Sequence, residues 1–309
     1  MILKIASKGC FLALLVSILV GCGTTSDPID RVAALTVETQ VISNIEYDTV
    51  DSVNLLLDLY IPAKKLGEPP WIEYSENRKP TLLFLHGGGW TSGDKISRSL
   101  QVMPFVENGW CVVTANYRHL DQTDIINIIG DTRRVLNWVY ENANTYKFDT
   151  TKIIVSGESA GGHLALMAGF ITNDLMFQPA TKKINRVLKV AGVINWFGVV
   201  DLVTASETWD KAYLLNVVKD SSKTDIILRK ASPVTYITAS SSPVMTIHGD
   251  LDVSAPYEQG VILHEKLKNL GVKNYFLTIP GKKHGNFDAF ERTAIFRDVW
   301  KFLKEMGIE

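Results

Sequence analysis

Short apolar runs alternate with helical stretches along most of the chain. Six runs, each bounded by glycine, asparagine or aspartate, predict buried strands at 81–85, 111–115, 153–156, 187–194, 244–247 and 275–279. Helical periodicity predicts helices at 124–143, 160–170, 257–270 and 289–306. Unbroken apolar strands are typical of parallel sheets that are buried on both faces. The alternation therefore predicts an α/β fold with a mostly parallel central sheet and helices on both faces.

The stretch ahead of these runs predicts a different kind of pairing. Residues 53–60 alternate weakly between apolar and polar positions, and we expect them to pair with 41–47 as an antiparallel hairpin. A proline-containing loop at 62–80 follows. No internal repeat or second-domain boundary is visible after that point, so we expect one domain over residues 39–309.

The first 22 residues form a separate unit. Lys4 and Lys8 precede an apolar run at 10–20 that would rise roughly 16 Å as a helix, about half the hydrocarbon thickness of a bilayer. We therefore expect a secretory signal peptide at 1–21 rather than a membrane span. Leu-Val-Gly-Cys at 19–22 resembles the bacterial lipobox, which implies a lipid on Cys22 and a polar tether over 22–38. An ordinary cleaved signal with an incidental cysteine is the alternative.

Composition narrows the classes of partner. With 32 Lys and Arg against 33 Asp and Glu, the chain lacks the basic excess that nucleic-acid binding usually requires. Aromatic and β-branched residues throughout the chain exclude disorder, and a single long apolar run excludes a polytopic membrane protein. The lipobox interpretation places the protein on the bacterial cell envelope, at the outer membrane or its periplasmic face. No disulfide is expected, because Cys111 would be the one cysteine within the folded domain.

A candidate nucleophile lies between a predicted strand and a predicted helix. Gly157-Glu158-Ser159-Ala160-Gly161 has the form G-x-S-x-G. The chemistry needs a cramped turn that exposes the serine hydroxyl, and glycine on either side lets strand and helix approach without side-chain collision. The helix N-terminus also favours developing negative charge. We therefore identify Ser159 as the candidate nucleophile.

A second glycine motif, His86-Gly87-Gly88-Gly89-Trp90, follows the predicted strand at 81–85. It matches neither of the phosphate-binding patterns G-x-x-x-x-G-K-[ST] and G-x-G-x-x-G. An oxyanion hole needs unobstructed main-chain N–H groups that converge on a carbonyl oxygen. Gly88 and Gly89 can supply two such groups and Ala160 a third. We expect His86 to brace this loop and Trp90 to form a wall of the substrate pocket.

A general base is expected on a loop near the serine. Of six histidines, His284 lies in a flexible loop just past the last predicted strand, which can place its imidazole over the serine turn. Three others are expected to be structural or solvated: His163 on the helix after the serine, His248 packed at a strand end, and His264 solvent-exposed on an amphipathic helix.

The acid should lie between Ser159 and His284 in chain order. Asp201, Asp250 and Asp252 all follow predicted strands, and spacing alone does not separate them. The 46 residues at 198–243 are too many for a plain connection. Two interpretations stay open for this segment: Trp209 and Tyr213 cover the pocket, with Trp209 binding substrate, or they pack only against the domain.

Taken in order, these motifs resemble those of α/β-hydrolase esterases of the hormone-sensitive-lipase-like or bacterial carbohydrate-esterase kind. The resemblance rests on segments 86–90, 116–118, 131, 157–163, 231–233, 248–256 and 281–285, and it covers about residue 40 to the C-terminus. By analogy with the family's G-D-x-D-x-x-x-P element, it implies Asp252 as the triad acid and Asp250 as a residue that shapes the turn. Leu120-Asp121-Gln122 replaces the proline-rich loop usual in hormone-sensitive-lipase relatives, and no long N-terminal cap is expected. Both departures favour the carbohydrate-esterase branch, which includes acetyl-xylan and feruloyl esterases.

The sequence therefore predicts a serine esterase with 39–309 as its catalytic domain. Ser159, His284 and Asp252 would hydrolyse short-acyl or aryl esters, among them acetyl or feruloyl esters of carbohydrates, through an acyl-enzyme. No metal or other cofactor is expected, because no metal-ligand motif such as H-E-x-x-H occurs. An arylformamidase, whose glycine loop is similar, is the nearest alternative, and a non-catalytic binding protein on the same scaffold is a second.

Overall fold

The computed structural model describes residues 39–65, 72–74, 77–97, 99–171, 177 and 184–308. The predicted signal peptide at 1–21 and the tether at 22–38, Cys22 included, lie outside these residues. Within the described part of the chain, no helix is both long and apolar enough to cross a membrane.

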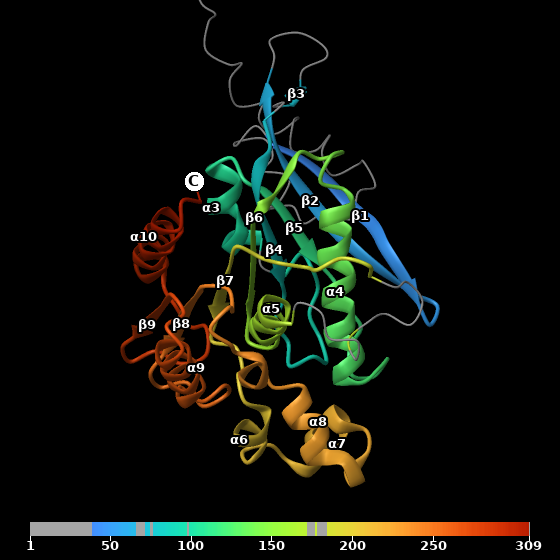
Figure 1. Cartoon of the computed structure of the whole chain (residues 1–309), viewed down its shortest axis with the longest axis vertical. Coiled ribbons are helices and arrows are strands. Elements are labelled where there is room, and N and C mark those ends of the chain that lie inside the picture. The colour runs from blue at the N-terminus through green and yellow to red at the C-terminus, as the bar shows by residue number, and fades with distance from the viewer. Residues whose placement is uncertain are drawn as a thin grey trace, which may run out of the picture.

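Nine strands of the described residues form one sheet through the centre of the molecule (Figure 1). In chain order they are β1 (Thr39–Val50), β2 (Val53–Lys65), β3 (Ile72–Tyr74), β4 (Lys79–Leu85), β5 (Cys111–Ala115), β6 (Phe148–Glu158), β7 (Gly192–Trp196), β8 (Val244–Gly249) and β9 (Asn274–Ile279). Their spatial order is β1-β2-β5-β4-β6-β7-β8-β9, and β3 pairs with β2 beside this path. β1 and β2 form an antiparallel hairpin, and all pairs from β5 to β9 are parallel. The mostly parallel sheet with an N-terminal hairpin is therefore confirmed.

Helices cover both faces of the sheet, as predicted. α4 (Ile125–Glu141), α5 (Ala160–Phe170) and α9 (Glu258–Asn269) contribute to one core cluster. α3 (Ser99–Glu107) and α10 (Ala289–Glu305) contribute to a second cluster on the opposite face. Successive strand residues alternate between the two: in β4, Leu83 belongs to the first cluster, and Leu82 and Phe84 belong to the second. Burial on both faces explains why the strands appear as unbroken apolar runs.

Three elements differ from the sequence prediction. The strand predicted at 187–194 begins only at Gly192, because β7 pairs with β6 from that residue onward. Leu188 and Val190 are buried ahead of it by packing rather than by strand pairing. Helix α3 is absent from the prediction because it contains Pro104, which breaks the helical pattern. β3 lies within the predicted loop at 62–80.

The long connection at 198–243 is helical. It contains α6 (Leu202–Ser206), α7 (Lys211–Val218), η2 (Ser221–Lys223), α8 (Thr224–Lys230) and η3 (Pro233–Tyr236). Asp201, Asp210 and Asp220 cap the first three of these elements by accepting backbone N–H groups. Figure 1 shows α6, α7 and α8 grouped at one end of the molecule, beyond α5. This group of short helices is the segment whose role the sequence left open.

Candidate active site

Ser159 lies on the turn between β6 and α5, where its motif predicts it. Its φ of 53° is in the left-handed region, a strained geometry for a serine. The flanking glycines permit this turn because side chains would not fit. A Cβ on Gly157 would lie 2.3 Å from the carbonyl oxygen of Gly161, and one on Gly161 would lie 2.1 Å from the carbonyl oxygen of Leu85. Strand and helix therefore meet in direct backbone contact beneath the serine.

Three side chains from separate turns and loops form one hydrogen-bonded chain. The Nε2 atom of His284 lies 2.8 Å from Oγ of Ser159. The Nδ1 atom of the same ring lies 2.7 Å from Oδ2 of Asp252. Because an ionised carboxylate can only accept, Nδ1 carries the ring proton and Nε2 is left to accept the serine proton. Ser159, His284 and Asp252, singled out from the sequence, thus lie together in space.

Asp252 is buried and surrounded by donors. Its Oδ1 atom accepts the backbone N–H groups of Ser254 and Ala255 at 2.9 and 3.1 Å. Burial by itself would raise the pKa of Asp252, but hydrogen bonds from His248 and His284 outweigh burial and hold the pKa well below its ordinary range. The carboxylate is therefore charged when it faces the imidazole.

The other two candidate acids hold local structure. Oδ1 of Asp250 accepts the backbone N–H of Gly281 at 2.6 Å, which fastens the start of the loop that carries His284. Asp201 caps α6 by accepting the backbone N–H of Val203 at 3.0 Å. Among the described residues, Asp252 is the one candidate of the three whose carboxylate contacts His284.

The glycine loop at 87–89, which follows β4, lines the same cavity as Ser159 and His284. Gly88 and Gly89 have φ values of 124° and 60°, which glycine adopts without strain. A Cβ on Gly88 would lie 2.0 Å from the carbonyl oxygen of Ser92. Among the described residues, the backbone N–H groups of Gly88 and Gly89 have no hydrogen-bond acceptor, so both can donate to a substrate oxygen. Ala160 is the first residue of α5, where amides lack intrahelical acceptors.

Two histidines near this loop are neutral structural groups. Nδ1 of His86 donates to the carbonyl oxygen of Gly87 at 2.8 Å, and its ring stacks on Tyr117. Nε2 of His163 donates to the carbonyl oxygen of Ala231 at 2.7 Å. Burial lowers the pKa of both histidines to about 4. Both rings are therefore uncharged at neutral pH and are held by backbone carbonyls.

The expectation that His264 is solvent-exposed is wrong. Its side chain is 7% exposed, and its ring stacks on Phe276 of β9 with an interplanar angle of 2°. Nδ1 of His264 lies 2.9 Å from Oδ1 of Asn274. Burial lowers its pKa to about 4. The helical pattern of α9 alone did not indicate that the edge strand β9 lies against this face.

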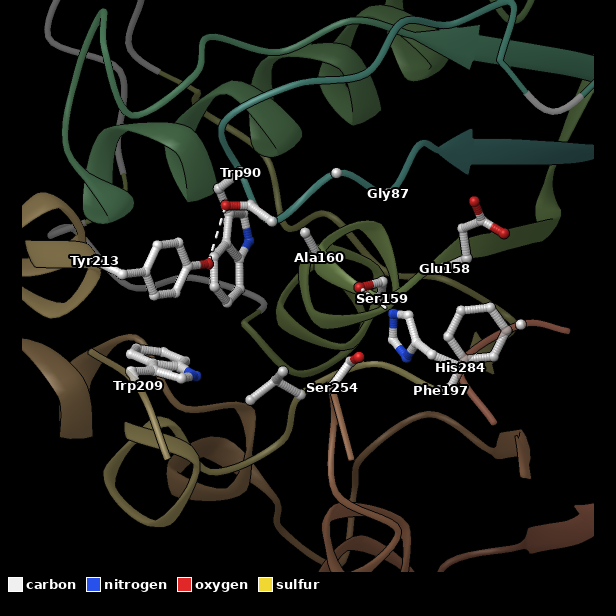
Figure 2. A pocket seen from close by; sticks show the side chains of 14 residues that line it. Gly87, Trp90, Glu158, Ser159, Ala160, Phe197, Trp209, Tyr213, Ser254 and His284 are labelled. Carbon is white, nitrogen blue, oxygen red and sulfur yellow. Dashed lines mark hydrogen bonds between the residues drawn. The ribbon is translucent and has the colours of Figure 1, made fainter. Parts of the chain in front are cut away.

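A cavity of about 540 Å³ opens over Ser159 and His284 (Figure 2). Trp90, Trp209 and Tyr213 form its wall on one side of the serine. Trp209 makes ring contacts with both neighbours, at centroid distances of 6.1 and 5.1 Å. The volume lies within the range of small-molecule sites. Trp209 and Tyr213 of segment 198–243 therefore cover the pocket and do not pack only against the rest of the domain.

Phe197 and His248 are among the residues of this site that were not identified from the sequence. Phe197 lines the cavity, and its ring lies 4.7 Å from that of His284. It directly follows β7, so the rule that sites gather at carboxyl ends of parallel strands could have found it. His248, for which the sequence suggested only a packing role, lies with Nε2 3.3 Å from Oδ2 of Asp252. In the part of the chain that the structure describes, no group of three His, Cys, Asp or Glu side chains is arranged to hold a metal ion.

Residues 57–267 of the chain match the BD-FAE family. Two proteins of Mycobacterium tuberculosis are similar in sequence. "Esterase LipQ" is 29% identical over 226 residues, which cover 71% of this chain and 52% of that protein. "Probable carboxylic ester hydrolase LipM" is 32% identical over 239 residues, which cover 74% and 54%. The chain thus spans about half the length of these two relatives.

Two further similarities bear on the fold and the chemistry. The Drosophila melanogaster "Kynurenine formamidase" is 25% identical over 258 residues, covering 81% of this chain and 80% of that protein. A solved structure, "Truncated form of carbohydrate esterase from gut microbiota", superposes with a TM-score of 0.73 at 24% identity, covering 87% of this chain and 97% of that one. That likeness shows the α/β-hydrolase fold. Since the family match extends over more than half of its residues, the chain belongs to the BD-FAE family.

Proposed function

We propose that this protein is a serine esterase that hydrolyses short-acyl or aryl carboxylic esters through an acyl-enzyme on Ser159. The observation that carries the proposal is the hydrogen-bonded chain from Ser159 through His284 to Asp252, at 2.8 and 2.7 Å, which opens into a pocket. A chain of this kind activates a hydroxyl that is otherwise a weak nucleophile.

Each proposed step uses a group that lies at the pocket. Oγ of Ser159 forms a bond to the ester carbonyl carbon while its proton passes to Nε2 of His284. The carbonyl oxygen becomes an oxyanion, which the N–H groups of Gly88, Gly89 and Ala160 stabilise. The bond to the alcohol oxygen then breaks, and the alcohol leaves with the proton from His284. A water molecule then attacks the acyl carbon while its proton passes to Nε2 of His284. The bond to Oγ of Ser159 breaks, Oγ takes the proton back from His284, and the carboxylic acid leaves.

The pocket wall supports an aryl or sugar ester as substrate. Trp209 is half-buried and Trp90 almost fully buried, and both line the cavity on one side of Ser159; this aromatic wall suits a planar acyl group such as feruloyl or the apolar face of a sugar. The structurally similar carbohydrate esterase supports the same class. We therefore propose acetyl or feruloyl esters of carbohydrates as natural substrates, with Trp90 and Trp209 as substrate-binding residues.

An activity panel tests this proposal. The wild-type protein and Ser159→Ala are compared on 4-nitrophenyl acetate, methyl ferulate, acetylated xylo-oligosaccharide and feruloylated arabinose. We expect wild-type turnover of the simple esters and higher kcat/KM on at least one sugar ester, with all activity abolished in the variant. Activity that survives in Ser159→Ala would refute the nucleophile, and absence of turnover of every ester would refute the esterase.

Amide hydrolysis on the same machinery is a second candidate. The similarity to the Drosophila kynurenine formamidase, over most of both chains, supports it. The same panel is extended to N-formylkynurenine. A kcat/KM for this formamide above that for every ester would make the protein a formamidase and not an esterase.

We also propose that Cys22 carries a lipid that holds the protein on the bacterial cell envelope. The lipobox-like Leu-Val-Gly-Cys at 19–22 supports this. Expressed in a bacterium that is fed a labelled fatty acid, the wild type should be labelled and sediment with membranes. Cys22→Ser should be unlabelled, and an equally labelled variant would exclude Cys22.

A further inference from the structure

A second imidazole, besides that of His284, contacts the carboxylate of Asp252. Nε2 of His248 lies 3.3 Å from Oδ2 of Asp252, the same oxygen that accepts from His284 at 2.7 Å. His248 and Asp252 are four residues apart, at the end of β8 and in the turn that follows. Both side chains are fully buried.

The backbone fixes the proton position of His248. Its Nε2 atom lies 2.8 Å from the carbonyl oxygen of Ala255. A carbonyl oxygen can only accept, so Nε2 must carry a proton. Nδ1 has no hydrogen-bond partner among the described residues, which favours a neutral ring because a second, buried N–H would go unpaired. The Nε2–H group of His248 therefore donates to the Ala255 carbonyl and also lies within 3.3 Å of the Asp252 carboxylate.

With this contact, four N–H groups surround the two oxygens of the carboxylate. An ionised carboxylate has about four lone-pair sites. Oδ1 of Asp252 accepts from the amides of Ser254 and Ala255; Oδ2 accepts from His284 and lies 3.3 Å from Nε2 of His248. N–H groups at both oxygens oppose rotation of the carboxylate about its Cβ–Cγ bond. The orientation of His284 depends on that plane.

We propose that His248 is a positioning residue that holds Oδ2 of Asp252 in the plane of the His284 imidazole. This role rests on the proposed esterase function, in which Asp252 orients His284 and stabilises its charged form. The titratable groups that face the cluster are Asp252 and His284 from their loops and Tyr257, whose ring lies 5.7 Å from that of His248 ahead of α9. Without the Nε2–H group, Oδ2 keeps His284 as its single partner, and only the two amides on Oδ1 oppose a tilt of the carboxylate out of the imidazole plane.

A matched pair of substitutions tests the donor. Gln and Met are both unbranched and of similar size, but only Gln places an N–H near the position of Nε2. His248→Gln is expected to retain kcat for 4-nitrophenyl acetate within about threefold of wild type, and His248→Met to lose roughly 10–100-fold, the size of a lost hydrogen bond to a charge. KM should change little in either, because His248 does not line the pocket. Equal kcat in two folded variants, checked by thermal unfolding, would overturn the proposal.

A measurement on the unmodified protein covers the case in which the variants fail to fold. In protein labelled with ¹⁵N in its histidine rings, His248 should show a protonated Nε2 and an unprotonated Nδ1 at pH 8. Phosphonylation of Ser159 removes the hydroxyl proton that faces Nε2 of His284, so the hydrogen-bonded chain to the shared carboxylate changes and the Nε2–H resonance of His248 should move. A protonated Nδ1, or a resonance unmoved in fully phosphonylated protein, would overturn the role of His248. Absence of wild-type ester turnover would instead refute the esterase itself.

Discussion

The hydroxyl of Tyr213 donates a hydrogen bond to the carbonyl oxygen of Gly89, 3.0 Å away. This bond ties α7, in the segment that covers the pocket, to the glycine loop 124 residues earlier in the chain. The loop needs such support, because φ is positive at Gly88, Gly89 and Trp90 in succession, and for Trp90 that conformation is strained. The phenol of Tyr213 thus couples the segment that covers the pocket to the glycine loop, beside the ring contact of Trp209 with Trp90.

Tyr213→Phe should lower kcat for 4-nitrophenyl acetate by roughly three- to tenfold, the effect of losing one neutral hydrogen bond of about 1 kcal/mol. Burial raises the pKa of Tyr213 to about 12, so the wild-type hydroxyl remains a donor throughout the assay range. Tyr236→Phe is a matched control, because Tyr236 also donates to a carbonyl in this segment, that of Lys230. Steady-state kinetics that give the same kcat for both variants would contradict the coupling.

Asp252→Asn should reduce kcat by roughly 10³–10⁴-fold, because an amide cannot hold His284 in the tautomer that accepts the serine proton. Asp250→Asn is the control. Its carboxylate binds the backbone N–H of Gly281 rather than the imidazole, and the expected loss is below tenfold. Both are measured as kcat/KM on the same ester. If Asp250→Asn proved the more damaging, Asp250 would have to be the acid.

Stability should depend on pH through three buried histidines. The pKa values of His86, His163 and His264 are lowered by burial from 6.5 to about 4. In the unfolded chain the three imidazoles therefore bind protons near pH 6.5, whereas in the folded chain they bind protons only near pH 4. Their contribution is present in full above pH 6.5 and is lost as the pH falls through that window, by up to about 3 kcal/mol for each ring.

Urea unfolding at pH values from 7 to 4.5 measures this loss. His264→Gln removes one of the three rings, so the slope of unfolding free energy against pH should fall by up to about 1.4 kcal/mol per pH unit near pH 5. His264 is the suitable ring to replace, because it lies against β9 and outside the pocket. An unchanged slope would mean that His264 titrates normally in the folded protein.

Much of the site was predictable because its geometry is imposed by local backbone. Gly157 and Gly161 flank Ser159 where any side chain would collide with a carbonyl, so the turn leaves a readable motif. Gly88 has a φ that few other residues adopt. The parallel sheet was predictable for a similar reason, because strands buried on both faces leave unbroken apolar runs.

What the sequence could not predict depends on contacts between distant segments. His264 belongs to a helix with an ordinary amphipathic pattern, and only the packing of β9 against it makes it buried. Leu188 and Val190 are apolar because they pack in the core, although they lie outside the strand ladder. Trp209 and Tyr213 likewise cover the pocket because segment 198–243 runs across the glycine loop, and the sequence alone does not show that path.

Covalent labelling of Ser159 tests the central claim most directly. Wild-type protein and His284→Asn are incubated with a fluorophosphonate, and the adduct is located by intact-mass and peptide mass spectrometry. The account predicts one adduct per chain, on Ser159, formed at least roughly 10³-fold faster in the wild type than in His284→Asn, because the imidazole activates the hydroxyl. An adduct on another residue, or equal rates in the two proteins, would contradict it.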